Sequence, residues 1–126
     1  MRILIVDDEP AGIQSLKRGL QLLGHSVGVA VNGLEALEAF ARERKSTDLI
    51  ITDYSMPGMN GIDLLKAVRR ENRKLPIVLV TAYGNQKVLM EALQNGCSGY
   101  LQKPFTLEQL DAEIIRIFGQ GSVTQQ

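Results

Sequence analysis

Reactive side chains follow several short apolar runs of this sequence. Residues 7–9 are Asp-Asp-Glu after the first run, Asp53 follows a second, Thr81 a third, and Lys103 a fourth. If each run is a strand of one parallel sheet, the carboxyl ends of the strands lie at one rim, where such sheets bind ligands. The spacing therefore predicts a single site with carboxylates, a hydroxyl and an ammonium group.

This combination of groups suits magnesium-assisted phosphoryl transfer. Clustered carboxylates disfavour one another's ionisation, and a hard divalent cation removes that penalty. Mg²⁺ prefers oxygen ligands and commonly combines one or two carboxylates with phosphate oxygens. Asp53 is a candidate nucleophile, because carboxylates form aspartyl-phosphates. Mg²⁺ and Lys103 would supply positive charge to the phosphoryl oxygens, and Thr81 a hydrogen bond.

The pattern along the chain predicts a strand–helix unit repeated five times. Short β-branched runs bounded by polar residues are typical of strands buried on both faces of a sheet. Between these runs, apolar residues recur at the spacing of an α-helix. Asn32, Asn60 and Thr106 are candidate N-caps of these helices. We therefore expect an α/β fold, a flavodoxin-like doubly wound parallel sheet in the order 2-1-3-4-5 with helices on both faces. The expected strands are residues 3–6, 27–31, 49–51, 77–80 and 99–101.

The composition fits one small domain. We expect residues 1–118 to form it and residues 119–126 to be a flexible tail or linker stub. Acidic and basic residues balance at 14 each, so no direct nucleic-acid binding is expected. No apolar run approaches the ~20 residues that span a bilayer, so no membrane association is expected. The single cysteine, Cys97, favours a cytoplasmic location; we interpret it as a packing residue and His25 as a surface residue.

Four motifs closely resemble the receiver domain of two-component response regulators. They are ILIVDDEP at 3–10, DLIITDYSMPGMNG at 48–61, PIVLVTA at 76–82 and GYLQKPF at 99–105. The resemblance covers about residues 2–118, and the motifs occur in the family's order and spacing. The expected receiver domain is therefore residues 1–118.

The resemblance implies a role for each site residue. Asp53 is implied as phosphoacceptor and metal ligand. Asp8 is implied as a direct Mg²⁺ ligand, the backbone carbonyl of Ser55 as another, and Asp7 as a ligand through water. Lys103 is implied to form an ion pair with the phosphoryl group.

Other residues are implied to switch the domain or to set the lifetime of the phosphorylated state. Thr81 would move toward the phosphoryl group, and Tyr100 would turn inward as it moves. Ser55 and Tyr83 would tune access of the hydrolytic water. The Lys103–Pro104 peptide bond is cis in many relatives.

As a family member, the chain would accept a phosphoryl group from a sensor histidine kinase or a histidine phosphotransfer domain. Phosphorylation would alter the surface of the fourth helix, fifth strand and fifth helix, and so control an unknown output partner or a missing output domain. The domain would not be an enzyme beyond transfer to and from its own aspartate, and would be a monomer or a phosphorylation-linked homodimer. Exposed residues of the first helix would face the donor: Gln14, Lys17, Arg18 and Gln21.

Three alternatives stay open. A Mg²⁺-dependent aspartyl-phosphate hydrolase would place its nucleophile after the first strand with a second acid two residues on, here Asp7 and Glu9. A flavodoxin-like electron carrier is disfavoured, because the acids at 7–9 would repel a flavin phosphate. A receiver-like adaptor would signal without phosphorylation, which the complete set of Asp8, Asp53, Thr81 and Lys103 argues against.

Overall fold

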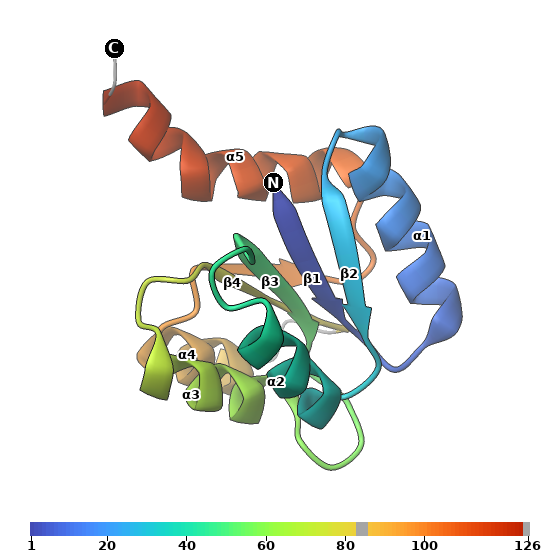
Figure 1. The fold of residues 1–126 in the computed structure, drawn as a ribbon, viewed down its shortest axis with the longest axis vertical. Helices are drawn as coiled ribbons and strands as arrows, with labels where there is room; N and C mark the ends of the chain where they lie inside the picture. The colour runs from blue at the N-terminus through green and yellow to red at the C-terminus, as the bar shows by residue number, and fades with distance from the viewer. Residues whose placement is uncertain (83–85, 125–126) are drawn as a thin grey trace.

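Strands and helices alternate along the described part of the chain (Figure 1). The computed structural model describes residues 1–82 and 86–124. Its five strands form one parallel sheet in the order β2-β1-β3-β4-β5, which confirms the predicted fold class and strand order. In chain order the elements are β1 (Arg2–Val6), α1 (Pro10–Leu22), β2 (Ser26–Ala30), α2 (Gly33–Arg42), β3 (Leu49–Asp53), α3 (Gly61–Glu71), β4 (Ile77–Thr81), α4 (Gln86–Gln94), β5 (Gly99–Gln102) and α5 (Leu107–Thr124).

Helices cover both faces of this sheet (Figure 1). On one face, Ile51 of β3 lies in an apolar cluster with Leu110 of α5 and Leu20 of α1. On the other, Ile50 of β3 clusters with residues of α2 and α3, and Leu79 of β4 with residues of α3 and α4. Every residue of β3 and β4 is buried, as expected of central parallel strands. Within the described part of the chain, no helix combines the length and apolarity needed to cross a membrane.

Some predicted boundaries were wrong by one or two residues. β3 and β4 extend to include Asp53 and Thr81, which the sequence had placed just after them. β2 begins and ends one residue earlier than predicted, so Val31 lies outside it. Val31 does not extend the strand because its N–H donates to Glu35 Oε1 of α2 at 3.2 Å.

The start of the last helix, α5, was predicted correctly. Thr106 and Gln109 form the predicted capping box: the Gln109 N–H donates to Thr106 Oγ1 at 3.0 Å, and the Thr106 N–H to Gln109 Oε1 at 2.8 Å. The last helix, α5, continues to Thr124, into the segment expected to be a tail. Gly119 is helical and does not adopt the left-handed backbone that ends many helices. The division into a domain and a flexible tail stays a prediction.

Candidate functional site

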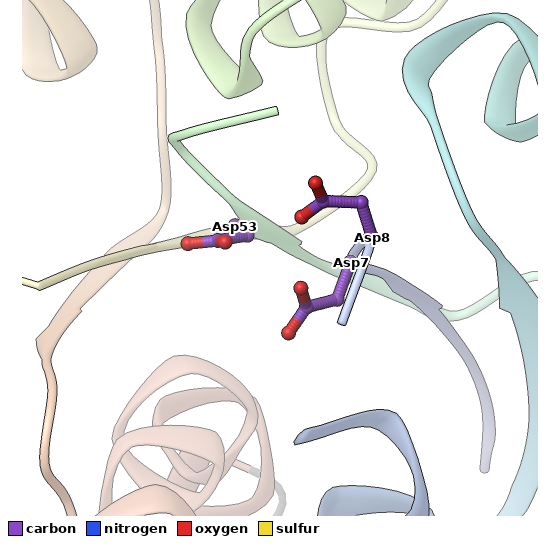
Figure 2. Close-up of side chains that lie close together, drawn as sticks. All are labelled: Asp7, Asp8 and Asp53. Carbon is purple, nitrogen blue, oxygen red and sulfur yellow. The ribbon is translucent and has the colours of Figure 1, made fainter. Parts of the chain in front are cut away.

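Three carboxylates converge at the carboxyl ends of β1 and β3 (Figure 2). Asp7, Asp8 and Asp53 each place an oxygen within 4.8 Å of the other two. The strand register brings them together, because Val6 of β1 pairs with Thr52 of β3. Asp7 and Asp53 are buried, with 7% and 8% of their surface exposed, whereas Asp8 is exposed. One accessible and two buried carboxylates therefore line one rim of the sheet.

Asp7 is held by the start of α1. Its Oδ1 accepts the Glu9 N–H at 3.1 Å, and its own N–H donates to the Ala30 carbonyl at 3.1 Å. A Cβ atom at Gly12 would lie 3.2 Å from Asp7 Oδ2, so the glycine lets α1 pass close to this carboxylate. We did not predict a role for Gly12. Its only sequence signal is a glycine inside a helix, where glycine is unfavourable without a packing reason.

Lys103 faces the carboxylates from the end of β5. Its Nζ lies 3.4 Å from Asp53 Oδ2 and 3.9 Å from Asp7 Oδ2. The Lys103 N–H donates to the Thr81 carbonyl at 2.7 Å, and the Lys103–Pro104 peptide bond is cis. The structure thus brings Lys103 close to Asp7 and Asp53, although the three residues lie far apart in the sequence.

The electrostatic balance at Asp53 is unfavourable to its negative charge. Burial raises the pKa of Asp53 above the ordinary value; Lys103 acts to lower it, and Asp7 adds to the rise. The site therefore favours the arrival of further positive charge. Because the converging ligands are all carboxylate oxygens, they fit a hard cation such as Mg²⁺ better than a soft metal.

Thr81 ends β4, and Tyr100 lies near the start of the neighbouring strand β5. Thr81 is 6% exposed. Tyr100 packs against a cluster that includes Val88 and Ala92 of α4, and its hydroxyl oxygen is enclosed. Burial raises the pKa of the Tyr100 hydroxyl, while the Thr81 side chain acts to lower it. The two side chains are therefore neighbours.

The loop after β3 approaches Asp53 closely. Ser55 is exposed, and Tyr83, the other residue implied to tune lifetime, lies outside the described residues. The Gly61 N–H donates to the Tyr54 carbonyl at 2.8 Å. A Cβ atom at Gly61 would lie only 2.5 Å from the Asp53 carbonyl oxygen, so this contact requires glycine.

His25 and Cys97 lie apart from this cluster. His25 follows α1 and is half-buried, and the terminal amine of Met1 lies 3.2 Å from its Nδ1. Cys97 packs at the edge of two apolar clusters, and burial raises the pKa of its thiol. Neither residue contributes to the site.

Fold and site together define a doubly wound α/β domain with an acidic cluster and a lysine at the carboxyl ends of its strands. Residues 3–115 match the family model of the response regulator receiver domain. The chain belongs to this family of two-component signalling domains, as its motifs predict.

Two relatives show the range of proteins that contain such a domain. Response regulator MprA of Mycobacterium leprae is 41% identical over 114 residues, which cover 90% of this chain and 49% of that protein. The chain thus spans about half the length of this relative. Chemotaxis protein CheY of Pseudomonas aeruginosa is 41% identical over 121 residues, which cover 94% of this chain and 96% of that protein.

Solved structures agree with the fold. A response regulator receiver domain protein from Clostridium thermocellum has a TM-score of 0.90 at 28% identity, covering 98% of both chains. The response regulator TrrA from Thermotoga maritima, solved in complex with Mg(2+)-BeF, has a TM-score of 0.82 at 33% identity. That match covers 92% of this chain and 97% of TrrA.

Proposed function

We propose that this domain is a phosphorylation-dependent switch in which Asp53 accepts a phosphoryl group from a phosphohistidine. One observation carries the proposal: three carboxylates lie within 4.8 Å of one another, with the Lys103 ammonium 3.4 Å from Asp53. The relative TrrA supports it, because that protein was solved with Mg(2+)-BeF, a metal and a phosphoryl analogue that suit such a site.

The metal proposed for the site is Mg²⁺. Asp8 and Asp53 would hold it through their carboxylates, Ser55 through its backbone carbonyl, and Asp7 through a water molecule. These donors are all oxygens, as Mg²⁺ requires. When bound, Mg²⁺ supplies positive charge to the phosphoryl oxygens.

The transfer step uses this chain's own groups. A carboxylate oxygen of Asp53 attacks phosphorus, the O–P bond forms as the P–N bond breaks, and the donor imidazole leaves with the electron pair. The Lys103 ammonium offsets charge on the phosphoryl oxygens, and the Thr81 hydroxyl donates a hydrogen bond to one of them. Because the acceptor is its own aspartate, the domain acts as a switch rather than as an enzyme with a separate substrate.

The phosphoryl group then changes the domain's surface. Thr81 moves toward the new oxygens, and Tyr100 follows it, which repacks the face formed by α4, β5 and α5. Burial of Thr81 and enclosure of the Tyr100 hydroxyl beside it support this coupling. Ser55 and Tyr83 set how readily water removes the phosphoryl group.

The proposed partners follow from this chemistry. The donor is a sensor histidine kinase or a histidine phosphotransfer domain that docks beside the site on α1. Gln14, Arg18 and Gln21 are exposed on that helix, and Lys17 is partly exposed. The receiving partner is a separate protein or a linked output domain, and the switch acts in the cytoplasm as a monomer or a phosphorylation-linked homodimer.

Intact-mass measurement after incubation with acetyl phosphate and Mg²⁺ tests the proposal. Wild type is expected to gain one phosphoryl group, and chelation of the metal is expected to abolish the gain. Asp53→Ala is expected to gain none, while Asp111→Ala, at a carboxylate on α5, is expected to match wild type. Absence of any gain in wild type would favour the adaptor that signals without phosphorylation, and a gain that survives in Asp53→Ala would place the acceptor elsewhere.

A further inference from the structure

α5 closes the open edge of β5 with two charged side chains. β5 is an edge strand of the sheet. The Tyr100 N–H donates to Glu113 Oε2 at 3.1 Å, and Arg116 Nη2 donates to the Ser98 carbonyl at 2.8 Å. Arg116 Nε also donates to Glu113 Oε1 at 2.6 Å. We call the Glu113–Arg116 pair the edge clasp; it satisfies backbone groups that an edge strand otherwise leaves open.

The close approach of the clasp depends on the sequence at the start of β5. A Cβ atom at Gly99 would lie 3.0 Å from Glu113 Oε2 and 3.0 Å from Ile117 Cδ1. Glycine at this position therefore lets the carboxylate reach the strand.

The Glu113 side chain is mostly buried, with 17% of its surface exposed. Burial raises the pKa of Glu113, but hydrogen bonds from Arg116 and the Tyr100 N–H lower it more, so the net shift is downward. The carboxylate is therefore ionised and held as an acceptor at neutral pH. Charged acceptors make stronger hydrogen bonds than neutral ones, which suits a lasting link between α5 and β5.

We propose that Glu113 and Arg116 are positioning residues that couple Tyr100 to α5. The inference rests on the proposed function, in which Tyr100 is the switching residue. The Tyr100 ring packs against α4, while its backbone is bound to α5 by Glu113. A displacement of β5 at Tyr100 is therefore passed to α5 directly, as well as to α4 through the ring.

Amide hydrogen exchange with beryllofluoride titration, followed by NMR, tests the clasp in the whole chain. In Glu113→Ala the Tyr100 amide is expected to exchange about tenfold faster, because its hydrogen bond is lost. Glu113→Gln is expected to fall between wild type and Glu113→Ala, since its amide oxygen can accept the same N–H but carries no charge and cannot also accept from Arg116. The Ile51 amide in β3 is expected to be unchanged, which separates a local effect from general destabilisation. Glu108→Ala, at an exposed residue of α5, is the matched control.

The second readout is the response of α5. With Mg²⁺ and beryllofluoride, wild type is expected to show chemical-shift changes in α5. Glu113→Ala is expected to lose at least half of these changes, and Glu113→Gln is expected to lose fewer of them. Unchanged Tyr100 exchange or an undiminished α5 response in Glu113→Ala would overturn the inference. If that variant does not fold, Arg116→Ala is the second variant: it removes the contacts to the Ser98 carbonyl and to Glu113 Oε1, and it is expected to reduce the α5 response with a smaller effect on Tyr100 exchange, because the Tyr100 bond to Glu113 stays. An undiminished α5 response in Arg116→Ala would overturn the inference. Failure of wild type to respond, or to gain a phosphoryl group, overturns the proposed function itself.

Discussion

The Lys103 ammonium lies 3.4 Å from a carboxylate oxygen of Asp53 and only 3.9 Å from one of Asp7. One cation thus faces two buried carboxylates, with the exposed Asp8 beside them. Burial raises the pKa of Asp53, and Asp7 adds to the rise; together they outweigh the lowering by Lys103. The site is therefore arranged to receive additional positive charge.

Lys103→Met is expected to slow phosphorylation of Asp53 by acetyl phosphate about a hundredfold, because a charge aimed at the phosphoryl oxygens is lost. It is also expected to raise the pKa of Asp53 further, since Lys103 lowers it in wild type. Timed intact-mass measurements give the rate, and NMR titration of the carboxyl carbon gives the pKa direction. Lys74→Met, at an exposed lysine beyond α3, is the control. A variant rate equal to that of wild type would contradict the role given to Lys103.

Asp53→Asn is expected to raise the stability of the metal-free protein at neutral pH. The pKa of Asp53 is raised in the folded state above the ordinary value of 3.8, so folding favours the protonated carboxyl. The corresponding stability is present below pH 3.8 and is lost as the pH rises through the folded-state pKa. An asparagine side chain is uncharged, like the protonated carboxyl, so the Asp53→Asn variant does not lose this stability as the pH rises.

Urea unfolding with a chelator present checks this pH dependence. The difference in free energy of unfolding between Asp53→Asn and wild type is expected to be largest at neutral pH and to shrink toward pH 3.8. A difference that is constant with pH would show that ionisation of Asp53 is not its cause.

The fold could be predicted because each strand carries its own local signal. Burial on both faces produces β-branched runs such as residues 49–51 and 77–80, and alternation with helical patterns leaves few topologies. The convergence of Asp53 and Lys103 follows from that topology, since the carboxyl ends of parallel strands share one rim. Their separation of 3.4 Å depends on side-chain packing and was not predictable.

The contact between α5 and β5 had no sequence signal. In the sequence, Glu113 is an ordinary charged residue of a predicted helix. Only the packing of α5 on β5 brings its carboxylate to the Tyr100 N–H. The end of α5 at Thr124 was not predictable either, because a glycine such as Gly119 is compatible with either a helix end or its continuation.

Gly61→Ala is expected to destabilise the domain by about 1–3 kcal/mol, because its Cβ would overpack a filled space. That atom would lie 2.5 Å from the Asp53 carbonyl oxygen and 2.6 Å from Leu79 Cδ1. Urea unfolding measures the loss. The same change at Gly119, where the Cβ would lie 3.4 Å from Ile115 Cγ2, is expected to stabilise α5 by about 0.5–1 kcal/mol. Equal effects at the two glycines would show that the contact at Asp53 can relax.

Mg²⁺ is expected to stabilise wild type, because a ligand that binds only the folded state adds about 2.7 kcal/mol at a hundred times its Kd. Asp8→Asn is expected to weaken Mg²⁺ binding about tenfold, which removes about 1.4 kcal/mol at saturating metal. Asp7→Asn is expected to have a smaller effect, since its proposed contact runs through water. Thermal unfolding across a Mg²⁺ series measures all three proteins, with Asp111→Asn as control. If Asp8→Asn keeps the wild-type dependence on Mg²⁺, the exposed carboxylate is not a metal ligand and the site must hold its cation with the two buried acids alone.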